Sequence, residues 1–363
     1  LAATAAMAPP PVLRLAGFFP MRGAWPGGVS VRPAVMAAIA DVNNDTTLLN
    51  QTELQLVAHD SACDGPTALT EGLAYHPTMN SSSYEAPIVG ILGPGCSPAC
   101  ESMSILANVW RYPTLSFSCT SPTLSNTADY PYFLRLSIPD FTVANVWLAL
   151  VREFGWQRVG LINQAGELFD STITAFTQYL MAAKVPYVQA NETLRSDATP
   201  NDAARAVASL AAGGVRIILF ACYEDVARSL FRALHAAGMY GQQYAFLTLG
   251  WLTEGWWAEA AGGDENVTEV AKYHFAVQKM TCGVTPTASC AAFRSRFAAP
   301  DAYTHYGYDA VWAWARALDA AIRRGDERAL LGGGRGGFAD PDKSDLWWHL
   351  RNLTFEGVSG TIA

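Results

Sequence analysis

Two groups of hydroxyl side chains follow predicted strands and could bind an anion. Ser97 stands between a predicted strand at residues 87–92 and a predicted helix at residues 98–111. There it would cap the helix, with Pro98 in the first helical position. The N–H groups and the dipole at a helix start attract negative charge. The second group, Ser-Cys-Thr-Ser at residues 118–121, follows the next predicted strand. Alone it is typical of a turn, but together with Ser97 it favours a carboxylate site.

The elements that would position these groups alternate between strands and helices. The predicted strands are 12–20, 53–59, 87–92, 114–118, 158–162, 187–190, 216–221 and 244–249, and the predicted helices are 32–43, 98–111, 143–154, 171–183, 201–212 and 225–238. Such alternation indicates an α/β fold in which helices cover both faces of parallel sheets. Ligands of these sheets lie beyond the carboxyl ends of the strands, where both hydroxyl groups fall.

The number of strands predicts two lobes. A change of register near residues 135–139 divides the strands into two sets of about four. From residue 258 onward we expect a long helix at 302–324, a glycine-rich loop at 332–337 and a last helix at 343–352. These later elements must complete both lobes, because neither has enough helices otherwise.

The composition is that of a folded, acidic chain. Its 363 residues are 50% hydrophobic and 15% charged, with 24 Lys and Arg against 32 Asp and Glu and a net charge of −8. This excludes disorder along the whole chain, and the lack of a dense basic stripe argues against a nucleic-acid partner. The best apolar stretch, residues 207–222, is broken by two glycines and Arg216, so a membrane anchor is expected only outside this fragment. Residues 1–11 are expected to be a linker or remnant.

Glycosylation triplets and cysteines indicate the secretory pathway. Asn-X-Ser/Thr acceptors occur at Asn44, Asn50, Asn80, Asn191, Asn266 and Asn352. The cysteines number seven, so at least one is unpaired or bonded outside the fragment. Cys282 and Cys290 bracket a loop that a disulfide would restrain, and Cys63 and Cys96 each follow a predicted strand, but spacing proves neither pairing. The sequence has no Cys-X2-Cys or His-X3-His motif, so we expect no metal and no cofactor.

Nine stretches carry a family resemblance. They are FFPMRGAWPGG (Phe18–Gly28), VAHDSACDG (Val57–Gly65), GPGCS (Gly93–Ser97), LSFSCTSPTLSN (Leu115–Asn126), YPYFLR (Tyr130–Arg135), ACYEDVAR (Ala221–Arg228), LGW (Leu249–Trp251), YDAVWAWA (Tyr308–Ala315) and FEGVSG (Phe355–Gly360). In this order they resemble the extracellular ligand-binding module of class C G-protein-coupled receptors, specifically the type B receptors for γ-aminobutyric acid.

The resemblance implies a two-lobed venus flytrap, similar to type I periplasmic binding proteins, that closes on a small molecule. Residues 12–137 with about 296–340 would form lobe 1, and residues 138–295 with about 341–363 would form lobe 2. It also implies a Cys63–Cys96 disulfide, a homo- or heterodimer formed through lobe 1, and a place on the extracellular face of the plasma membrane. The module is a receptor part and not an enzyme.

The family's ligand contacts carry over to particular positions. Ser97 and Thr120 match hydroxyls that hold the ligand's carboxylate, and Ser118 replaces a glycine and narrows the space. Three aromatic residues match pocket contacts, one on lobe 1 and two on lobe 2: Trp25, Tyr223 and Trp251.

The amine half of the site departs from the family. Ser137 stands where the family has a histidine, and Tyr303 where it has a glutamate. A buried ammonium without a negative partner costs on the order of several kcal/mol. We therefore expect a small carboxylate or an amino acid held differently, and weak or no binding of γ-aminobutyric acid. Glu224, or a cation–π contact with Tyr303, could still receive an ammonium.

Two alternatives share this fold. The ectodomain of a receptor-type nucleotide cyclase has similar HDS-X-CD and GP-X-CS motifs, and only sequence beyond residue 363 would separate the two. A non-binding partner subunit of a class C dimer is the other, against which the retained contact residues argue mildly. An enzyme is disfavoured because the sequence has no Gly-X-Ser-X-Gly elbow and no P-loop.

Overall fold

The chain divides into two compact units. The computed structural model describes residues 12–49, 52–79, 88–249, 252, 255–257, 264–277, 281–282, 286–297, 300–324 and 345–363. The first unit draws its described residues from Leu1–Thr120, Leu124–Ile138 and Met280–Ala363, and the second from Ser121–Thr123 and Pro139–Lys279. Two α/β units were expected, and the structure confirms that fold class.

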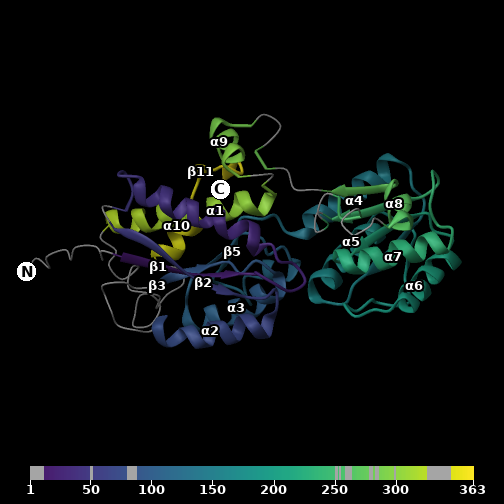
Figure 1. Ribbon diagram of the computed structural model, residues 1–363, viewed down its shortest axis with the longest axis horizontal. Helices are drawn as coiled ribbons and strands as arrows, with labels where there is room; N and C mark the ends of the chain where they lie inside the picture. Colours follow the sequence, from purple (N-terminus) through teal and green to yellow (C-terminus); the bar gives the residue numbers. More distant parts are fainter. Residues whose placement is uncertain are drawn as a thin grey trace, which may run out of the picture. The chain divides into compact units, whose positions relative to one another are not determined.

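A five-stranded parallel sheet forms the centre of the first unit, in the order β2-β1-β3-β4-β5. Its strands are β1 (Val12–Phe19), β2 (Glu53–Asp60), β3 (Ile88–Leu92), β4 (Thr114–Ser116) and β5 (Phe133–Arg135). Two pairs of helices enclose it: α1 (Gly28–Asn44) and α10 (Ala302–Arg324) on one face, and α2 (Gly65–Met79) and α3 (Ser97–Trp110) on the other (Figure 1). With both faces covered, β3 is buried along its whole length and consists of apolar residues.

A close helix–strand contact explains the single glycine of β3. A Cβ atom placed on Gly90 would lie 2.0 Å from the Cη2 atom of Trp314 on α10. Trp314 is fully buried, so its ring occupies the space that a side chain at position 90 would need. This packing holds α10, which is more than 200 residues away in sequence, against the central strand.

The C-terminal segment belongs to the first unit, which corrects the expected division of the chain. It contains α9 (Ala288–Arg296), α12 (Asp345–Arg351) and an antiparallel hairpin of β11 (Phe355–Glu356) and β12 (Thr361–Ile362). Residues 341–363 were expected in lobe 2, but Leu346 and Leu350 pack in the core formed by α1 and α10. Asp309 on α10 fastens the hairpin by accepting the Val358 and Ser359 N–H groups, each at 2.8 Å.

The second unit repeats the same architecture, with a parallel sheet in the order β10-β9-β8-β6-β7. Its strands are β6 (Val159–Asn163), β7 (Tyr187–Gln189), β8 (Ile217–Ala221), β9 (Ala245–Leu249) and β10 (His274–Val277). One face is covered by α6 (Pro200–Ala212), α7 (Glu224–Ala236) and α8 (Glu265–Ala271), and the other by α4 (Asp140–Glu153) and α5 (Glu167–Ala182). Apolar residues of α7 recur at helical spacing and face the core: Val226, Ala227, Leu230, Phe231 and Leu234.

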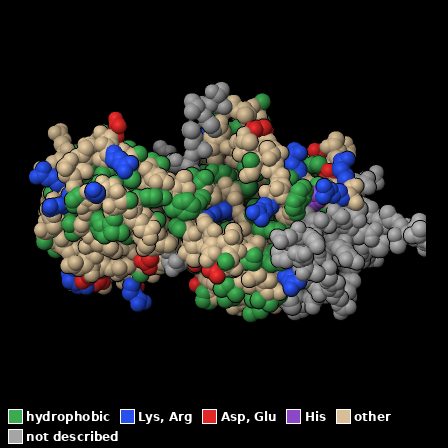
Figure 2. Space-filling model, turned by 180° about the vertical axis from the view of Figure 1, so that it is seen from behind, with side chains coloured by type: hydrophobic (Ala, Val, Ile, Leu, Met, Phe, Trp, Pro, Cys, Tyr) green, Lys and Arg blue, Asp and Glu red, His purple; other side chains and the backbone are tan. Residues whose placement is uncertain are grey.

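Two further observations concern the surface and the helices. On the face shown in Figure 2, Lys and Arg side chains are scattered among apolar and uncharged groups and form no continuous band. No described helix combines the length and the apolar character needed to cross a membrane. The expected linker (residues 1–11) and the glycine-rich loop at 332–337 lie outside the described residues.

Candidate functional site

Ser97 opens helix α3 at the carboxyl end of β3. The residue in the N-cap position is Cys96, and Pro98 is the second helical residue, so the expectation that Ser97 caps the helix is wrong by one position. The Ser97 side chain bonds to the next loop instead, because its Oγ accepts the N–H of Thr120 at 3.2 Å. Both residues are nearly fully buried. Ser97 and Thr120, predicted to act together, are therefore in direct contact.

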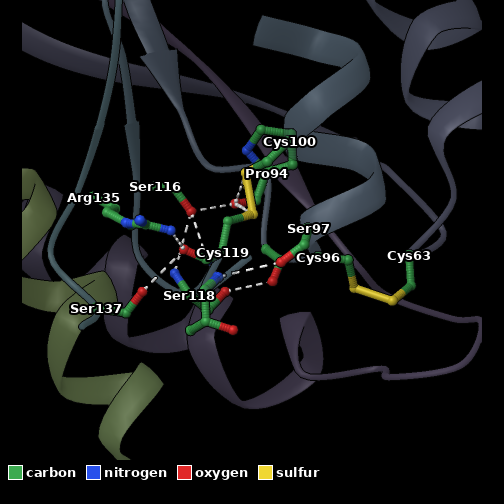
Figure 3. The surroundings of a disulfide bond; sticks show 12 residues. Cys63, Pro94, Cys96, Ser97, Cys100, Ser116, Ser118, Cys119, Arg135 and Ser137 are labelled. Carbon is green, nitrogen blue, oxygen red and sulfur yellow. Dashed lines mark hydrogen bonds between the residues drawn. A yellow bond between two sulfur atoms is a disulfide. The ribbon is translucent and has the colours of Figure 1, made fainter. Parts of the chain in front are cut away.

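A serine-rich loop follows β4 and packs onto the Pro94-Gly95 turn (Figure 3). Ser116 donates its hydroxyl to the Pro94 carbonyl at 2.7 Å, and Ser118 donates to the Gly95 carbonyl at 2.6 Å. The hydroxyl proton of Ser118 is thus used within the protein, so Ser118 shapes the site more than it offers a donor to a ligand.

A disulfide that the sequence analysis left open fixes this loop to α3. It joins Cys100 to Cys119, both fully buried. A second disulfide joins Cys63 to Cys96, as the resemblance implied, and ties the loop after β2 to the start of α3. Two covalent links therefore converge on the turn that carries Ser97 (Figure 3). Cys222 is free and buried.

Arg135 and Ser137 add two further donors at this edge of the sheet. The Arg135 guanidinium donates to the Cys119 carbonyl at 3.2 Å, and the Ser137 hydroxyl donates to the same oxygen at 3.3 Å. Arg135 was not predicted as a site residue. In the sequence it was noted only as the last residue of the YPYFLR stretch. The Arg135 guanidinium contacts Cys119, the residue before Thr120. Its positive charge favours binding of an anion at this loop.

Two aromatic residues of the first unit also meet. The rings of Trp25 and Tyr303 pack edge to face with centroids 5.1 Å apart. The carbonyl oxygen of Trp25 lies 3.8 Å from Cys96 Sγ, next to the start of α3. A Cβ on Gly27 would come within 2.1 Å of the Trp25 ring. A side chain at position 27 would therefore collide with the indole. Six of the eight predicted ligand contacts are therefore linked in the first unit: Trp25, Ser97, Ser118, Thr120, Ser137 and Tyr303.

In the second unit, Tyr223 lies at the carboxyl end of β8. Its N–H donates to Gln164 Oε1 at 3.0 Å, and its ring packs edge to face on Phe169 at 4.9 Å. Burial, and secondly the charge of Asp140, raise the pKa of the Tyr223 phenol far above its usual value, so the hydroxyl stays protonated and can donate. Trp251, the other predicted contact of this unit, lies outside the described residues.

The acidic residue beside Tyr223 already has a cationic partner. Glu224 Oε2 lies 3.3 Å from Arg228, which also contacts Asp225 at 3.2 Å. An ammonium ligand would compete with Arg228 for Glu224. Glu224 is therefore a poor candidate for receiving the ammonium group of a ligand.

Other predicted groups fall as follows. Asn44, Asn191, Asn266 and Asn352 are exposed, as glycan acceptors must be, and Asn50 and Asn80 lie outside the described residues.

Cys282 is bonded to Cys290 in the pairing that the sequence favoured. In the described part of the chain, one group of potential metal ligands has its ligand atoms within 4.8 Å of one another. It consists of Cys282, Cys290 and His305. His305 could not be foreseen because it is brought in by α10.

In chemical terms, the first unit holds a buried cluster of hydroxyls and peptide N–H groups at a helix start, beside a guanidinium and two aromatic rings. Such a cluster suits a small anion and offers no general base beside a nucleophile.

Comparison with known proteins identifies the family of the chain. The family model described as "Receptor family ligand binding region" matches residues 30–363. γ-Aminobutyric acid type B receptor subunit 1 of Mus musculus is 28% identical over 96% of this chain and 37% of that protein. Subunit 2 of Homo sapiens is 26% identical over 81% of this chain and 32% of its own length. Glutamate receptor 3.1 of Oryza sativa subsp. japonica is 27% identical over 80% of this chain and 31% of its own.

The chain spans about a third of the length of these curated relatives. Because the family match covers nearly the whole chain, from residue 30 to residue 363, this protein belongs to the family of receptor ligand-binding regions.

Proposed function

We propose that this chain is the ligand-sensing ectodomain of a cell-surface receptor. It binds a small carboxylate or amino acid between its two units and signals when they close on it. Membership of the receptor ligand-binding family supports this proposal, as do relatives named as receptors for γ-aminobutyric acid and as a glutamate receptor.

The observation that carries the proposal is the buried Ser97–Thr120 contact at the start of α3. The Thr120 N–H is held on Ser97 Oγ, which fixes the orientation of the Ser97 hydroxyl. The 14-residue helix behind it presents the positive end of its dipole. Disulfides on both sides keep the turn from rearranging. A carboxylate bound here meets donors that are already oriented, which reduces the entropy lost on binding.

The ligand's other end meets no carboxylate at the positions where the family has its amine-binding pair. Ser137 donates to a backbone carbonyl, and Tyr303 packs on Trp25. The expected consequence is that γ-aminobutyric acid binds weakly, with a dissociation constant well above micromolar. Micromolar binding of γ-aminobutyric acid in a calorimetric titration would contradict this part of the proposal.

Tyr223 and Trp251 are proposed as the contacts that drive closure. Only contacts made more strongly in the closed state can shift the equilibrium toward it. Trp251→Ala should therefore weaken affinity and ligand-induced compaction together. Small-angle scattering that shows undiminished compaction in this variant would remove Trp251 from the mechanism.

We also propose that the first unit mediates dimerisation. Leu73 on α2 and Ile105 and Val109 on α3 are apolar and more than half exposed, and the two helices pack side by side. Val109→Glu should shift the protein toward monomer in light scattering. Val146→Glu, at an exposed apolar position of the second unit, is the control and should leave the mass unchanged. Equal behaviour of the two variants would refute this interface.

The ligand is best identified by a thermal-shift screen of amino acids and small carboxylates on the protein. At a concentration of 100 times the dissociation constant, a ligand adds about 2.7 kcal/mol to the stability. Compounds that carry a carboxylate should raise the melting temperature, and their amides should not. A screen in which amides stabilise the protein as well as the acids would argue against a carboxylate site.

A further inference from the structure

Three residues with metal-ligating side chains meet in the first unit, and none of them belongs to the site described above. Cys282 and Cys290 stand just before and inside α9, and His305 lies in the first turns of α10. All three are buried, and their Sγ and imidazole nitrogen atoms lie within 4.8 Å of one another. Among the residues that the structure describes, these three form the group of side chains that could hold a metal ion.

The two ring nitrogens of His305 differ in their hydrogen bonding. His305 Nδ1 lies 2.7 Å from the carbonyl oxygen of Asp301. A carbonyl can only accept, so Nδ1 carries the proton and Nε2 presents a lone pair. Nε2 is buried and has no hydrogen-bond partner. Leaving a buried acceptor unpaired is unfavourable, and a ring N–H donated to a backbone carbonyl is the usual support of a metal-bound histidine.

We propose that Cys282, Cys290 and His305 form a Zn²⁺ site when the Cys282–Cys290 disulfide is reduced, so that this pair alternates between a disulfide and a metal centre. Two thiolates and one imidazole are a donor set that Zn²⁺ prefers. The carbonyl oxygen of Val358 lies 3.2 Å from Cys282 Sγ and can supply a fourth, oxygen ligand.

The exchange balances with a dithiol as reductant. The dithiol passes two electrons and two protons to the disulfide, which becomes two thiols while the dithiol becomes a cyclic disulfide. Binding of Zn²⁺ then releases those two protons, because thiolates are the ligands. The sulfur atoms must move apart, since two thiolates on one Zn²⁺, each at about 2.3 Å from the metal, are not bonded to each other.

The cluster is placed to act on the terminal hairpin. The Cys282 N–H donates to the Ser359 carbonyl at 2.9 Å, and Ser359 is also held by Asp309. A change at Cys282 therefore reaches β11 and β12 through a direct backbone contact.

Titration with Co²⁺, a coloured substitute for Zn²⁺, tests the site. The protein is reduced, freed of reductant under anaerobic conditions, and compared with the oxidised protein. We expect the reduced protein to bind one equivalent of Co²⁺ with a thiolate-to-cobalt charge-transfer band that Zn²⁺ abolishes, and the oxidised protein to show no such band.

Variants separate this site from the other cysteines. His305→Gln leaves the disulfide intact, so the protein can fold, and should weaken Co²⁺ binding roughly tenfold or more in the reduced state. C282A/C290A should lose the band, whereas C100A/C119A, the matched control, should keep it. The proposal is overturned if the reduced protein gives no charge-transfer band, or if the band and affinity are unchanged in His305→Gln.

Discussion

Removing the Cys100–Cys119 disulfide should cost the first unit much of its stability and disturb the candidate site. The two cysteines are 19 residues apart. In the chain-entropy model, a closed loop of this length stabilises the native state by about 3 kcal/mol, because it restricts the unfolded chain. Alanine in place of both residues avoids burying new hydroxyls at two positions that have no solvent exposure.

The other two disulfides give an internal scale. Cys63 and Cys96 are 33 residues apart, and Cys282 and Cys290 are 8 apart. The same model assigns them about 4 and about 2.5 kcal/mol. The three double-alanine variants should therefore rank in the order of their loop lengths.

Equilibrium urea unfolding is the assay, with the unfolding midpoint and the slope compared for each variant. The C100A/C119A variant should also bind ligand more weakly, because the Cys119 carbonyl holds Arg135 and Ser137 in place. A stability loss below about 1 kcal/mol, with ligand binding unchanged, would show that the hydrogen bonds alone fix the loop, and would refute the reasoning.

Three further predictions concern the scaffold. Burial lowers the pKa of His274 to about 4. The pKa of this imidazole is therefore lower in the folded protein than in the unfolded chain. The stability that depends on neutral His274 is present above about pH 6.5 and is lost as the pH falls toward 4. This loss should amount to about 2 to 3 kcal/mol between urea unfolding curves at neutral and acidic pH, and His274→Gln should lack that part of the slope. Gly90→Ala should destabilise the protein by about 1–3 kcal/mol, because the new methyl group collides with Trp314; Trp314→Phe in the same chain should recover part of that loss, and strictly additive effects would show that the collision is not its cause. Thr199→Ala should cost about 1 kcal/mol by removing the capping box with Asp202 at the start of α6; a melting temperature equal to that of the unchanged protein would contradict the cap's contribution.

The alternation of strands and helices made the architecture predictable. Apolar strands such as β3 and β8 are buried on both faces, so they stand out in the sequence as continuous hydrophobic runs. Strand β5, which has three residues, was missed. Strand β10 was missed because it lies at the sheet edge and two of its four residues are exposed.

The candidate site was predictable in its residues and less so in its contacts. Ser97, Thr120 and Trp25 could be named because strand ends and a family resemblance point to them. That Ser97 bonds to the Thr120 amide, and that Cys119 is linked to Cys100, depends on how the loop after β4 meets the start of α3, which spacing along the chain does not determine. Arg135 was missed as a site residue for the same reason.

The proposed metal-binding cluster of Cys282, Cys290 and His305 shows the same limit of reasoning from spacing. Local spacing gave no metal motif, and the expectation of no metal rested on that. The third group comes from α10, and only the packing of α9 against α10 brings it near the cysteines.

The central claim is that Ser97 holds the carboxylate of a small ligand. Calorimetric titration of a carboxylate found in the screen should be repeated on Ser97→Ala and on Ser104→Ala. Ser104 is the matched control, because it lies on the same helix and is equally buried, at 3% exposure. A hydrogen bond to a charged group contributes about 1.5–3 kcal/mol, so Ser97→Ala should weaken binding by roughly ten- to 150-fold while Ser104→Ala leaves it unchanged. Equal affinity of Ser97→Ala and the unchanged protein would contradict the claim.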